Sequence, residues 1–265
     1  MENSNLPELL KGELQQEEIL EQQVQNFRET ILSDEMLDFV KVCTNPFEEM
    51  YSRYNCAIME VETKFKVLNE ELGLKYDCNP IESIKSRLKS PNSLIRKVRD
   101  RKIPISIEEI EKNITDIAGV RVICSFPKDI YILEESFLRQ DDVRLLKRKD
   151  YIANPKENGY RSLHLIVEVP IFLKEETKYM KVEVQLRTIA MDFWASLEHK
   201  LRYKKKRTPE QTQEINKELF ECAEESARLD VRMQNLQIYL QDEDENQIID
   251  ISEILNSRPD QRKNL

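Results

Sequence analysis

Two segments concentrate cations, carboxylates and an aromatic ring in very little sequence. Tyr151–His164 reads YIANPKENGYRSLH, and Val182–Thr188 reads VEVQLRT. Lysine and arginine neutralise phosphate oxygens, and an aromatic ring can stack on a base. The two segments therefore predict a site for a phosphorylated nucleotide.

A third segment adds a second carboxylate at the start of an apolar run. Asp116–Arg121 reads DIAGVR and carries both an acid and an arginine. In a mixed sheet Asp116 and Glu183 would lie close enough to share a magnesium ion, which prefers carboxylate and phosphate oxygens and retains several waters. Gly119 and Gly159 are two of only four glycines, so we expect them at tight turns or where a ligand approaches closely.

Charge is distributed unevenly along the chain. The formal net charge is −9, with acidic residues near both ends, and the middle carries two basic groups: Arg87, Lys89, Arg96, Lys97, Arg99, Arg101, Lys102, and then Arg144, Lys147, Arg148, Lys149, Lys156, Arg161. Solvated helix faces would explain any single lysine. Two basic groups beside carboxylate-bearing strands instead favour local neutralisation of polyphosphates.

Composition and cysteine usage predict a soluble, cytoplasmic protein. A chain of 265 residues with 40% hydrophobic content can bury one catalytic domain with helical additions. The five cysteines are scattered and form no C-x-x-C pair, which argues against disulfides and a zinc site. The N-terminus shows no apolar leader segment, and no run is long enough to span a membrane.

Periodicity divides the chain into an N-terminal helical region at 1–78, a core at 79–207 and a C-terminal helical region with an acidic tail at 208–265. In the first region Asn45, Pro46 and Glu48 predict a helix start with a capping box. The stripe that follows has helical spacing and predicts packing: Phe47, Met50, Tyr54, Ile58, Val61, Phe65, Leu68.

The core reads as α/β. We expect a strand at Ala118–Phe126, a helix at Pro127–Leu138, and strands at Ser162–Val169 and Tyr179–Thr188 joined through Pro170 and the charged loop 174–178. Alternation in the last strand puts one set of side chains on a polar face, Lys181, Glu183, Gln185 and Arg187, and the other set in the core, Met180, Val182, Val184 and Leu186. A solvent-facing antiparallel strand has the same pattern.

The C-terminal region predicts a helix that begins with Thr208 as N-cap, Pro209 and Gln211. Steps of four and three then give an a/d seam: Ile215, Leu219, Cys222, Ser226, Leu229, Met233, Leu236, Leu240. Such a seam packs either on its own domain or on another subunit.

The three nucleotide segments, in this order, resemble the synthetase domain of the RelA/SpoT alarmone enzymes over roughly residues 80–206. The resemblance is to a small, single-domain alarmone synthetase with a nucleotidyltransferase-like mixed sheet flanked by helices. It implies transfer of the β,γ-pyrophosphate of ATP to the 3′-hydroxyl of GTP or GDP, which yields AMP and pppGpp or ppGpp.

The same resemblance implies residue roles. Asp116 and Glu183 would hold Mg²⁺, and Glu183 would help to deprotonate the 3′-hydroxyl. The guanosine nucleotide would contact a set in which Tyr160 stacks on guanine and the lysines neutralise phosphates: Lys149, Lys156, Tyr160, His164, Gln185. The run Ile84–Lys97 is similar to the family's S-R-x-K-x-x-x-S-x-x-x-K segment, so the ATP side would use Arg87 and Arg121 on adenine and Lys89, Ser93 and Lys97 on the triphosphate.

Partners and alternatives follow from the same residues. Relatives of this size are often tetramers. His164 and His199 are the only histidines, so the His-Asp hydrolase motif of the long family members is missing and alarmone hydrolysis is not expected. The alternatives are an inactive nucleotide- or RNA-binding regulatory module on the same fold, and a different nucleotidyltransferase. The sequence does not rank GTP, GDP and GMP, and it leaves open whether single-stranded RNA or an alarmone binds as a regulator.

Overall fold

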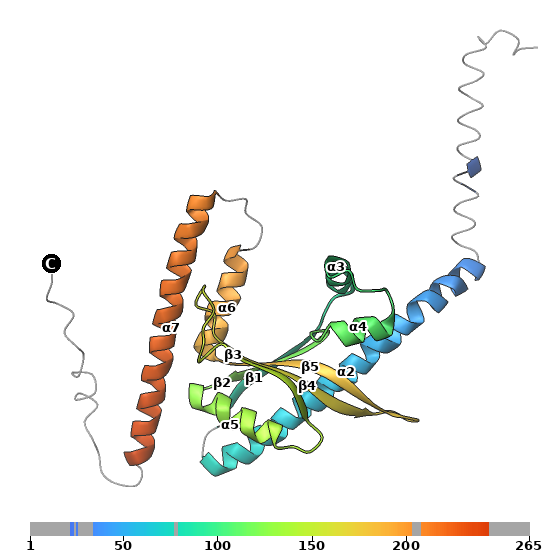
Figure 1. Cartoon of the computed structure of the whole chain (residues 1–265). Coiled ribbons are helices and arrows are strands. Elements are labelled where there is room, and N and C mark those ends of the chain that lie inside the picture. The colour runs from blue at the N-terminus through green and yellow to red at the C-terminus, as the bar shows by residue number, and fades with distance from the viewer. Residues whose placement is uncertain (1–21, 24, 26–33, 77–78, 203–207, 244–265) are drawn as a thin grey trace, which may run out of the picture. The chain divides into compact units, whose positions relative to one another are not determined.

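The computed structural model describes residues 22, 23, 25, 34–76, 79–202 and 208–243 (Figure 1). Two predicted regions lie mostly outside these residues: the start of the N-terminal helical region, up to Glu21, and the acidic C-terminal tail from Asp244 onward. The chain divides between Arg53 and Tyr54 into two units. The sheet and the site belong to the second unit, and the three-part division expected from the sequence remains a prediction.

Helix α2 (Asp34–Tyr76) shows that the expected helix start at Asn45 is wrong. The helix begins before this residue and continues through Pro46. An interior proline removes one backbone hydrogen bond, and the helical residues on both sides outweigh that loss. The predicted stripe is confirmed, because Tyr54, Val61 and Phe65 are fully or almost fully buried.

The remaining elements alternate as the sequence predicts for the core. In chain order they are β1 (Ile81–Leu88), α3 (Pro91–Asp100), α4 (Ile107–Asn113), β2 (Ala118–Cys124), α5 (Pro127–Leu138), β3 (Arg144–Asp150), β4 (Leu163–Phe172), β5 (Thr177–Thr188), α6 (Ile189–Arg202) and α7 (Pro209–Glu243). Among the described residues, no helix is both long enough and apolar enough to cross a membrane.

The strands form one mixed sheet, as expected. Its order is β1-β2-β5-β4-β3, in which β2 and β5 are parallel and every other neighbouring pair is antiparallel. The parallel pair lies at the centre and brings the start of β2, just after Asp116, beside the part of β5 that carries Glu183.

The two faces of the sheet differ as the alternation in β5 predicts. Met180, Val182, Val184 and Leu186 are buried. Helix α5 packs on this apolar side, and its Phe137 ring stacks on Phe65 of α2 with centroids 4.5 Å apart. The opposite side is polar, and α6 begins there directly after β5 (Figure 1).

Two strands were not anticipated and one was placed too short. β1 and β3 were interpreted only as basic segments, because their exposed faces show little apolar alternation. β4 extends past Val169 to Phe172 and includes Pro170. Proline is tolerated there because β3 pairs with β4 only as far as Glu168, so no strand on that side needs a donor from Pro170.

Helix α7 begins with the predicted capping box. The Thr208 amide donates to Gln211 Oε1 and the Gln211 amide donates to Thr208 Oγ1, both at 3.3 Å. Part of the predicted seam packs within the chain, since Leu219 is buried and its carbonyl accepts from Trp194 Nε1 at 2.8 Å. Leu229 and Met233 are half exposed. The buried side of the helix carries Ala223 and Asp230 instead of these two seam positions.

Asp230 connects α7 to the start of α6. Thr188 Oγ1 donates to Asp230 Oδ2 at 2.5 Å and accepts from the Met191 amide at 3.1 Å. Burial raises the pKa of Asp230, and this effect outweighs the Thr188 hydrogen bond and the charge of Arg161, which lower it. A carboxyl whose pKa is higher in the folded state stabilises the fold at low pH and loses that contribution as pH rises.

We therefore predict that Asp230→Asn stabilises the protein at neutral pH. The amide oxygen still accepts from Thr188, but no charge has to be buried. Urea unfolding between pH 4 and pH 8 measures the effect: the free energy of unfolding of the variant should exceed that of the wild type increasingly as pH rises. Glu221→Gln, an exposed change on the same helix, serves as control, and a destabilised Asp230→Asn at pH 7 would contradict the prediction.

Candidate active site

A row of polar side chains crosses the polar face of the sheet from edge to edge. Paired positions on the five neighbouring strands carry, in spatial order, Lys85, Arg121, Gln185, His164 and Lys149. All but Lys85 were predicted as site residues. Strand pairing alone brings together residues that are separated by up to 100 positions in sequence.

The neighbouring row contains Arg87, Gly119 and Glu183 at paired positions of β1, β2 and β5. A pocket opens over both rows and is lined by Lys85, Ser86, Arg87, Gly119, Val120, Arg121, Glu183 and Gln185. A Cβ added to Gly119 would meet no atom closer than 3.9 Å. Packing therefore does not require glycine there, and the missing side chain leaves space between Arg87 and Glu183.

Asp116 lies just before β2 and is paired with two predicted ATP-binding lysines. Lys97 Nζ lies 2.6 Å from Oδ1 and Lys89 Nζ lies 2.9 Å from Oδ2. Burial alone would raise the pKa of Asp116, but the hydrogen bonds and charges of the two lysines outweigh it and lower that pKa. Asp116 is therefore an ionised carboxylate held between two ammonium groups.

Glu183 is held on both carboxylate oxygens. Gln185 Nε2 donates to Oε2 at 2.9 Å, and His164 Nδ1 lies 3.5 Å from Oε1. Burial raises the pKa of Glu183 and the charge of Asp116 raises it further, but His164 and Gln185 outweigh both and the net pKa is lowered. The effect of Asp116 also shows that the two carboxylates, expected to act together, lie within electrostatic range.

Tyr160 is surrounded by aromatic and cationic groups. Its hydroxyl is 2.8 Å from His164 Nε2. Lys156 Nζ lies 4.8 Å from the centroid of the Tyr160 ring and 4.7 Å from that of Tyr151, so one ammonium contacts both rings. Gly159 has φ +83°, which confirms the tight turn expected just before this tyrosine.

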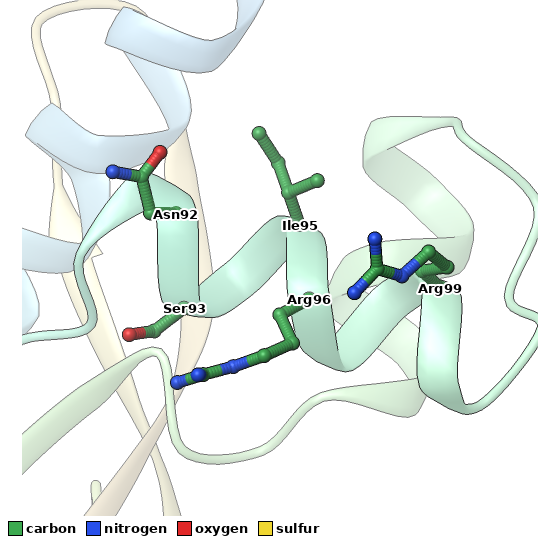
Figure 2. Close-up of a pocket in the computed structure, with 5 residues that line it drawn as sticks. All are labelled: Asn92, Ser93, Ile95, Arg96 and Arg99. Atoms are coloured by element: carbon green, nitrogen blue, oxygen red, sulfur yellow. The ribbon is translucent and has the colours of Figure 1, made fainter. Parts of the chain in front are cut away.

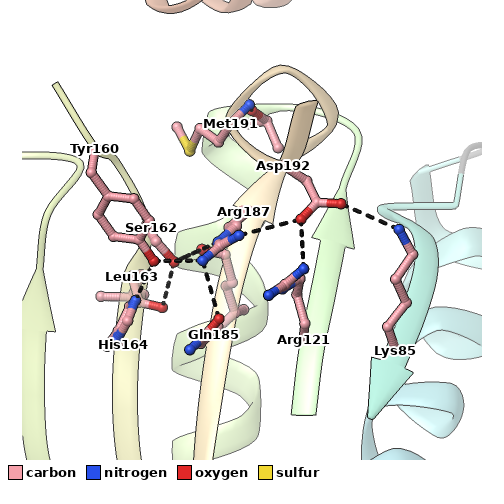
Figure 3. Close-up of polar contacts among 12 residues, drawn as sticks. Lys85, Arg121, Tyr160, Ser162, Leu163, His164, Gln185, Arg187, Met191 and Asp192 are labelled. Carbon is pink, nitrogen blue, oxygen red and sulfur yellow. Dashed lines mark hydrogen bonds and ion pairs between the residues drawn. The ribbon is translucent and has the colours of Figure 1, made fainter. Parts of the chain in front are cut away.

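Two charged residues that the sequence did not identify as site residues connect these groups. Arg187 Nη2 donates to Tyr160 Oη at 2.5 Å, and Asp192 Oδ1 accepts from both Arg187 Nη1 at 3.3 Å and Arg121 Nη1 at 3.0 Å (Figure 3). Asp192 Oδ2 also accepts from Lys85 at 3.2 Å. Alternation in β5 placed Arg187 on the correct face, but no local pattern marked Asp192, which comes from α6.

Two of the predicted site residues, Ser93 and Lys149, do not line the pocket over the sheet. Ser93 lies on α3 in a separate open pocket lined by Asn92, Ser93, Ile95, Arg96 and Arg99. Figure 2 shows Ser93 and Arg96 extending toward the same side of the helix, while Ile95 points away from them. Lys149 is exposed on the edge strand β3, opposite His164.

Several arginines of the second basic group have acidic partners. Arg148 donates to both oxygens of Glu134, at 2.6 and 2.9 Å. Arg161 donates to Glu224 of α7 at 2.7 Å, and Arg144 pairs with Glu168 across the strands. Among the predicted site residues of this group, Lys156 contacts two aromatic rings and Lys149 is exposed opposite His164.

Comparison with known proteins gives a consistent family. Residues 86–208 match the family model described as the region found in RelA / SpoT proteins. GTP pyrophosphokinase YwaC of Bacillus subtilis is 44% identical over 203 residues, which span 76% of this chain and 95% of that protein. GTP pyrophosphokinase YjbM of the same organism is 37% identical over 191 residues, or 72% of this chain and 88% of that protein.

Solved structures agree with the sequence relatives. A crystal structure of small alarmone synthetase 2 from Bacillus subtilis superposes with a TM-score of 0.65 at 42% identity and covers 73% of this chain and 98% of that chain. Small alarmone synthetase 1 from the same organism, bound to its product pppGpp, gives a TM-score of 0.66 at 36% identity and covers 74% and 98%.

Proposed function

The chain belongs to the family of RelA / SpoT proteins, and from that premise we propose that it is a small alarmone synthetase. It transfers the β,γ-pyrophosphate of ATP to the 3′-hydroxyl of GTP or GDP and releases AMP with pppGpp or ppGpp. The observation that carries the proposal is the pocket in which Arg87, Arg121 and Glu183 meet over Gly119. There, cations for a nucleotide lie beside an ionised carboxylate.

The ATP side uses the first two strands and α3. Arg87 and Arg121 line the pocket, and Arg121 Nε has no hydrogen-bond partner among the described residues. A planar guanidinium can stack on adenine, which an ammonium cannot do. Lys89 and Lys97 hold the triphosphate by exchanging the Asp116 oxygens for phosphate oxygens, and Ser93 contributes a hydroxyl from α3.

The guanosine side uses β4, β5 and the loop before β4. The Tyr160 ring stacks on guanine, while His164 and Gln185 contact the nucleotide beside Glu183. Lys156 already lies near the Tyr160 ring and Lys149 is exposed nearby on β3. Both can neutralise the phosphates of the acceptor as point charges.

Glu183 is the general base of this reaction. Its lowered pKa keeps the carboxylate ionised at neutral pH. It accepts the proton of the 3′-hydroxyl, the hydroxyl oxygen bonds to the β-phosphorus of ATP, and the bond from that phosphorus to the oxygen bridging the α-phosphate breaks. AMP leaves with that oxygen, so atoms and charge are balanced.

The donor set suits magnesium. Asp116 and Glu183 are two carboxylates within electrostatic range. Both oxygens of Asp116 bind cations in the structure, Lys97 and Lys89, and they become available to a metal ion when these lysines turn to the triphosphate. Mg²⁺ is commonly bound by one or two carboxylates together with substrate phosphates. When bound, it neutralises phosphate charge and lowers the cost of ionising the hydroxyl.

The test is a product assay. Purified protein is incubated with magnesium, labelled ATP and each of GTP, GDP and GMP, and products are separated by anion exchange. AMP formed in step with a 3′-pyrophosphorylated guanosine nucleotide supports the synthetase and ranks the acceptors. A folded protein without product, but with salt-dependent RNA binding, would instead favour the inactive binding module.

Within this assay, Glu183→Gln should lower kcat by roughly 10²–10⁴-fold, the contribution expected of a general base. The amide keeps the shape of the side chain, so circular dichroism should remain that of the wild type. Glu175→Gln, at an exposed position in the β4–β5 turn, is the matched control. Turnover near the wild-type level in Glu183→Gln would refute the assigned role.

Tyr160→Ala should raise the KM for GTP much more than the KM for ATP. Loss of base stacking costs roughly 1–3 kcal/mol, which corresponds to about a 5- to 150-fold change in affinity. Initial rates with one nucleotide varied and the other saturating measure both constants. An unchanged KM for GTP would exclude stacking on this ring.

An assembly of several copies is a further part of the proposal. Ile189, Phe193, Leu197 and Leu201 follow one another at steps of four on α6 and are 53, 64, 40 and 53% exposed. Leu229, Met233 and Leu240 of the predicted α7 seam are also about half exposed. An apolar stripe of this kind is typical of a helix that pairs with another surface, and we take that surface to belong to a second copy in a tetramer.

We expect light scattering to show a tetramer for the wild type. Phe193→Glu introduces a charge into the α6 stripe and should shift the protein toward smaller species at the same concentration. Lys174→Glu makes the same kind of charge change in the β4–β5 loop, away from α6, where the Lys174 side chain is 93% exposed, and it should leave the mass unchanged. A strictly monomeric wild type would contradict the assembly.

A further inference from the structure

Arg187 is almost fully buried beside Tyr160 and Gln185, two of the residues proposed to bind the guanosine nucleotide. It is 4% exposed and lies two positions beyond Gln185 on the same face of β5. Its guanidinium makes four hydrogen bonds: Nη2 to Tyr160 Oη at 2.5 Å, Nη2 to Gln185 Oε1 at 3.1 Å, Nη1 to Asp192 Oδ1 at 3.3 Å and Nε to Ser162 Oγ at 3.3 Å. A buried arginine with this many partners restrains each of them.

The chemistry of arginine sets the direction of these hydrogen bonds. A guanidinium only donates, so the Tyr160 hydroxyl accepts from Arg187, and the same hydroxyl shares a second hydrogen bond with His164 Nε2, 2.8 Å away. The other ring nitrogen of His164, Nδ1, faces Glu183 Oε1 at 3.5 Å. The first branch thus runs from Arg187 to one oxygen of the catalytic carboxylate.

A second branch reaches the other oxygen. Gln185 Oε1 accepts from Arg187, so the amide nitrogen of the same side chain must point away and donates to Glu183 Oε2 at 2.9 Å. Both branches therefore start at Arg187 and end at Glu183, the first in the 3.5 Å contact of His164 and the second in the hydrogen bond of Gln185. Without Arg187, the Gln185 amide and the Tyr160 hydroxyl lose the partner that selects one of their two orientations.

The ATP side does not depend on Arg187 in the same way. Asp192, the acid that neutralises Arg187, also accepts from Arg121 at 3.0 Å and from Lys85 at 3.2 Å. A lysine in place of Arg187 would retain a positive charge near Asp192 but could not reach Tyr160, Gln185, Ser162 and Asp192 together, because it lacks the planar fork.

We propose that Arg187 is a positioning residue for the guanosine nucleotide: it orients Tyr160 and Gln185, and through Tyr160 also His164, and it touches no substrate itself. The assignment of these residues to a guanosine nucleotide rests on the proposed function. The inference about Arg187 concerns binding of the guanosine nucleotide alone, so it can be tested without turnover.

The first experiment compares GTP binding by calorimetry, in the absence of ATP, for wild type, Arg187→Lys, Tyr160→Phe and the double variant. Each single variant should weaken binding by about tenfold, the size expected for losing a hydrogen bond to a charged group. Because Arg187 acts through the Tyr160 hydroxyl, the double variant should bind no more than about threefold more weakly than the weaker single variant. Multiplicative losses, or GTP binding at wild-type strength in Tyr160→Phe, would overturn the proposal.

The second experiment separates positioning from general loosening of the fold. Binding of an ATP analogue with a methylene group between its α and β phosphorus atoms should change by less than about twofold in Arg187→Lys, since Asp192 still holds Arg121. Equal weakening of both nucleotides would overturn the proposal. Arg139→Lys, an exposed arginine paired with Glu135 on α5, controls for the substitution itself.

Two features keep the outcome readable. Tyr160→Phe leaves the buried arginine and the tyrosine ring in place, so it tests the same hydrogen bond if Arg187→Lys fails to fold. Calorimetry also does not require product formation. GTP binding with a non-additive double variant, in a protein that forms no alarmone, would refute the proposed function and support the positioning role.

Discussion

Arg187 holds a permanent positive charge at a position that is 4% exposed, and the polar face of the sheet provides the acceptors that this charge requires. Burying an unpaired charge is costly, so Asp192 and the neutral oxygens of Tyr160, Gln185 and Ser162 surround it. The same contacts orient the groups beside Glu183. Charge neutralisation inside the protein and preparation of the site are therefore a single structural requirement.

The same principle applies at Asp116. Lys89 and Lys97 are fixed by this carboxylate, at 2.9 and 2.6 Å, on the side of the sheet where the triphosphate is proposed to bind. Each lysine can exchange a carboxylate oxygen for a phosphate oxygen, and the freed carboxylate can then face a magnesium ion. The net charge of −9 is thus compatible with a polyphosphate site, because the local pairing of charges, not their sum, determines what binds.

The C-terminal helix packs directly on the loop that carries Tyr160, on the side where the guanosine nucleotide is proposed to bind. A Cβ on Gly159 would lie 2.5 Å from the Ala223 Cβ, so the turn before Tyr160 packs tightly on α7. Arg161, on the other side of Tyr160, donates to Glu224 of the same helix. Helix α7 therefore fixes the loop with one side while another side, with Leu229 and Met233, remains half exposed. A partner surface that covers Leu229 and Met233 would therefore contact α7, the helix on which the loop carrying Tyr160 packs.

Local sequence patterns determined the elements whose signals lie within a few residues. Alternation in Tyr179–Thr188, the helix Pro127–Leu138 and the Thr208–Gln211 cap agree with the structure, and the nucleotide segments pointed to the correct family. The cap at Asn45 was wrong, because helical neighbours override a local start signal. Only tertiary structure showed that Lys85, Arg121 and Arg187 share Asp192, since that contact exists only where three strands and α6 meet, and no spacing along the chain encodes it.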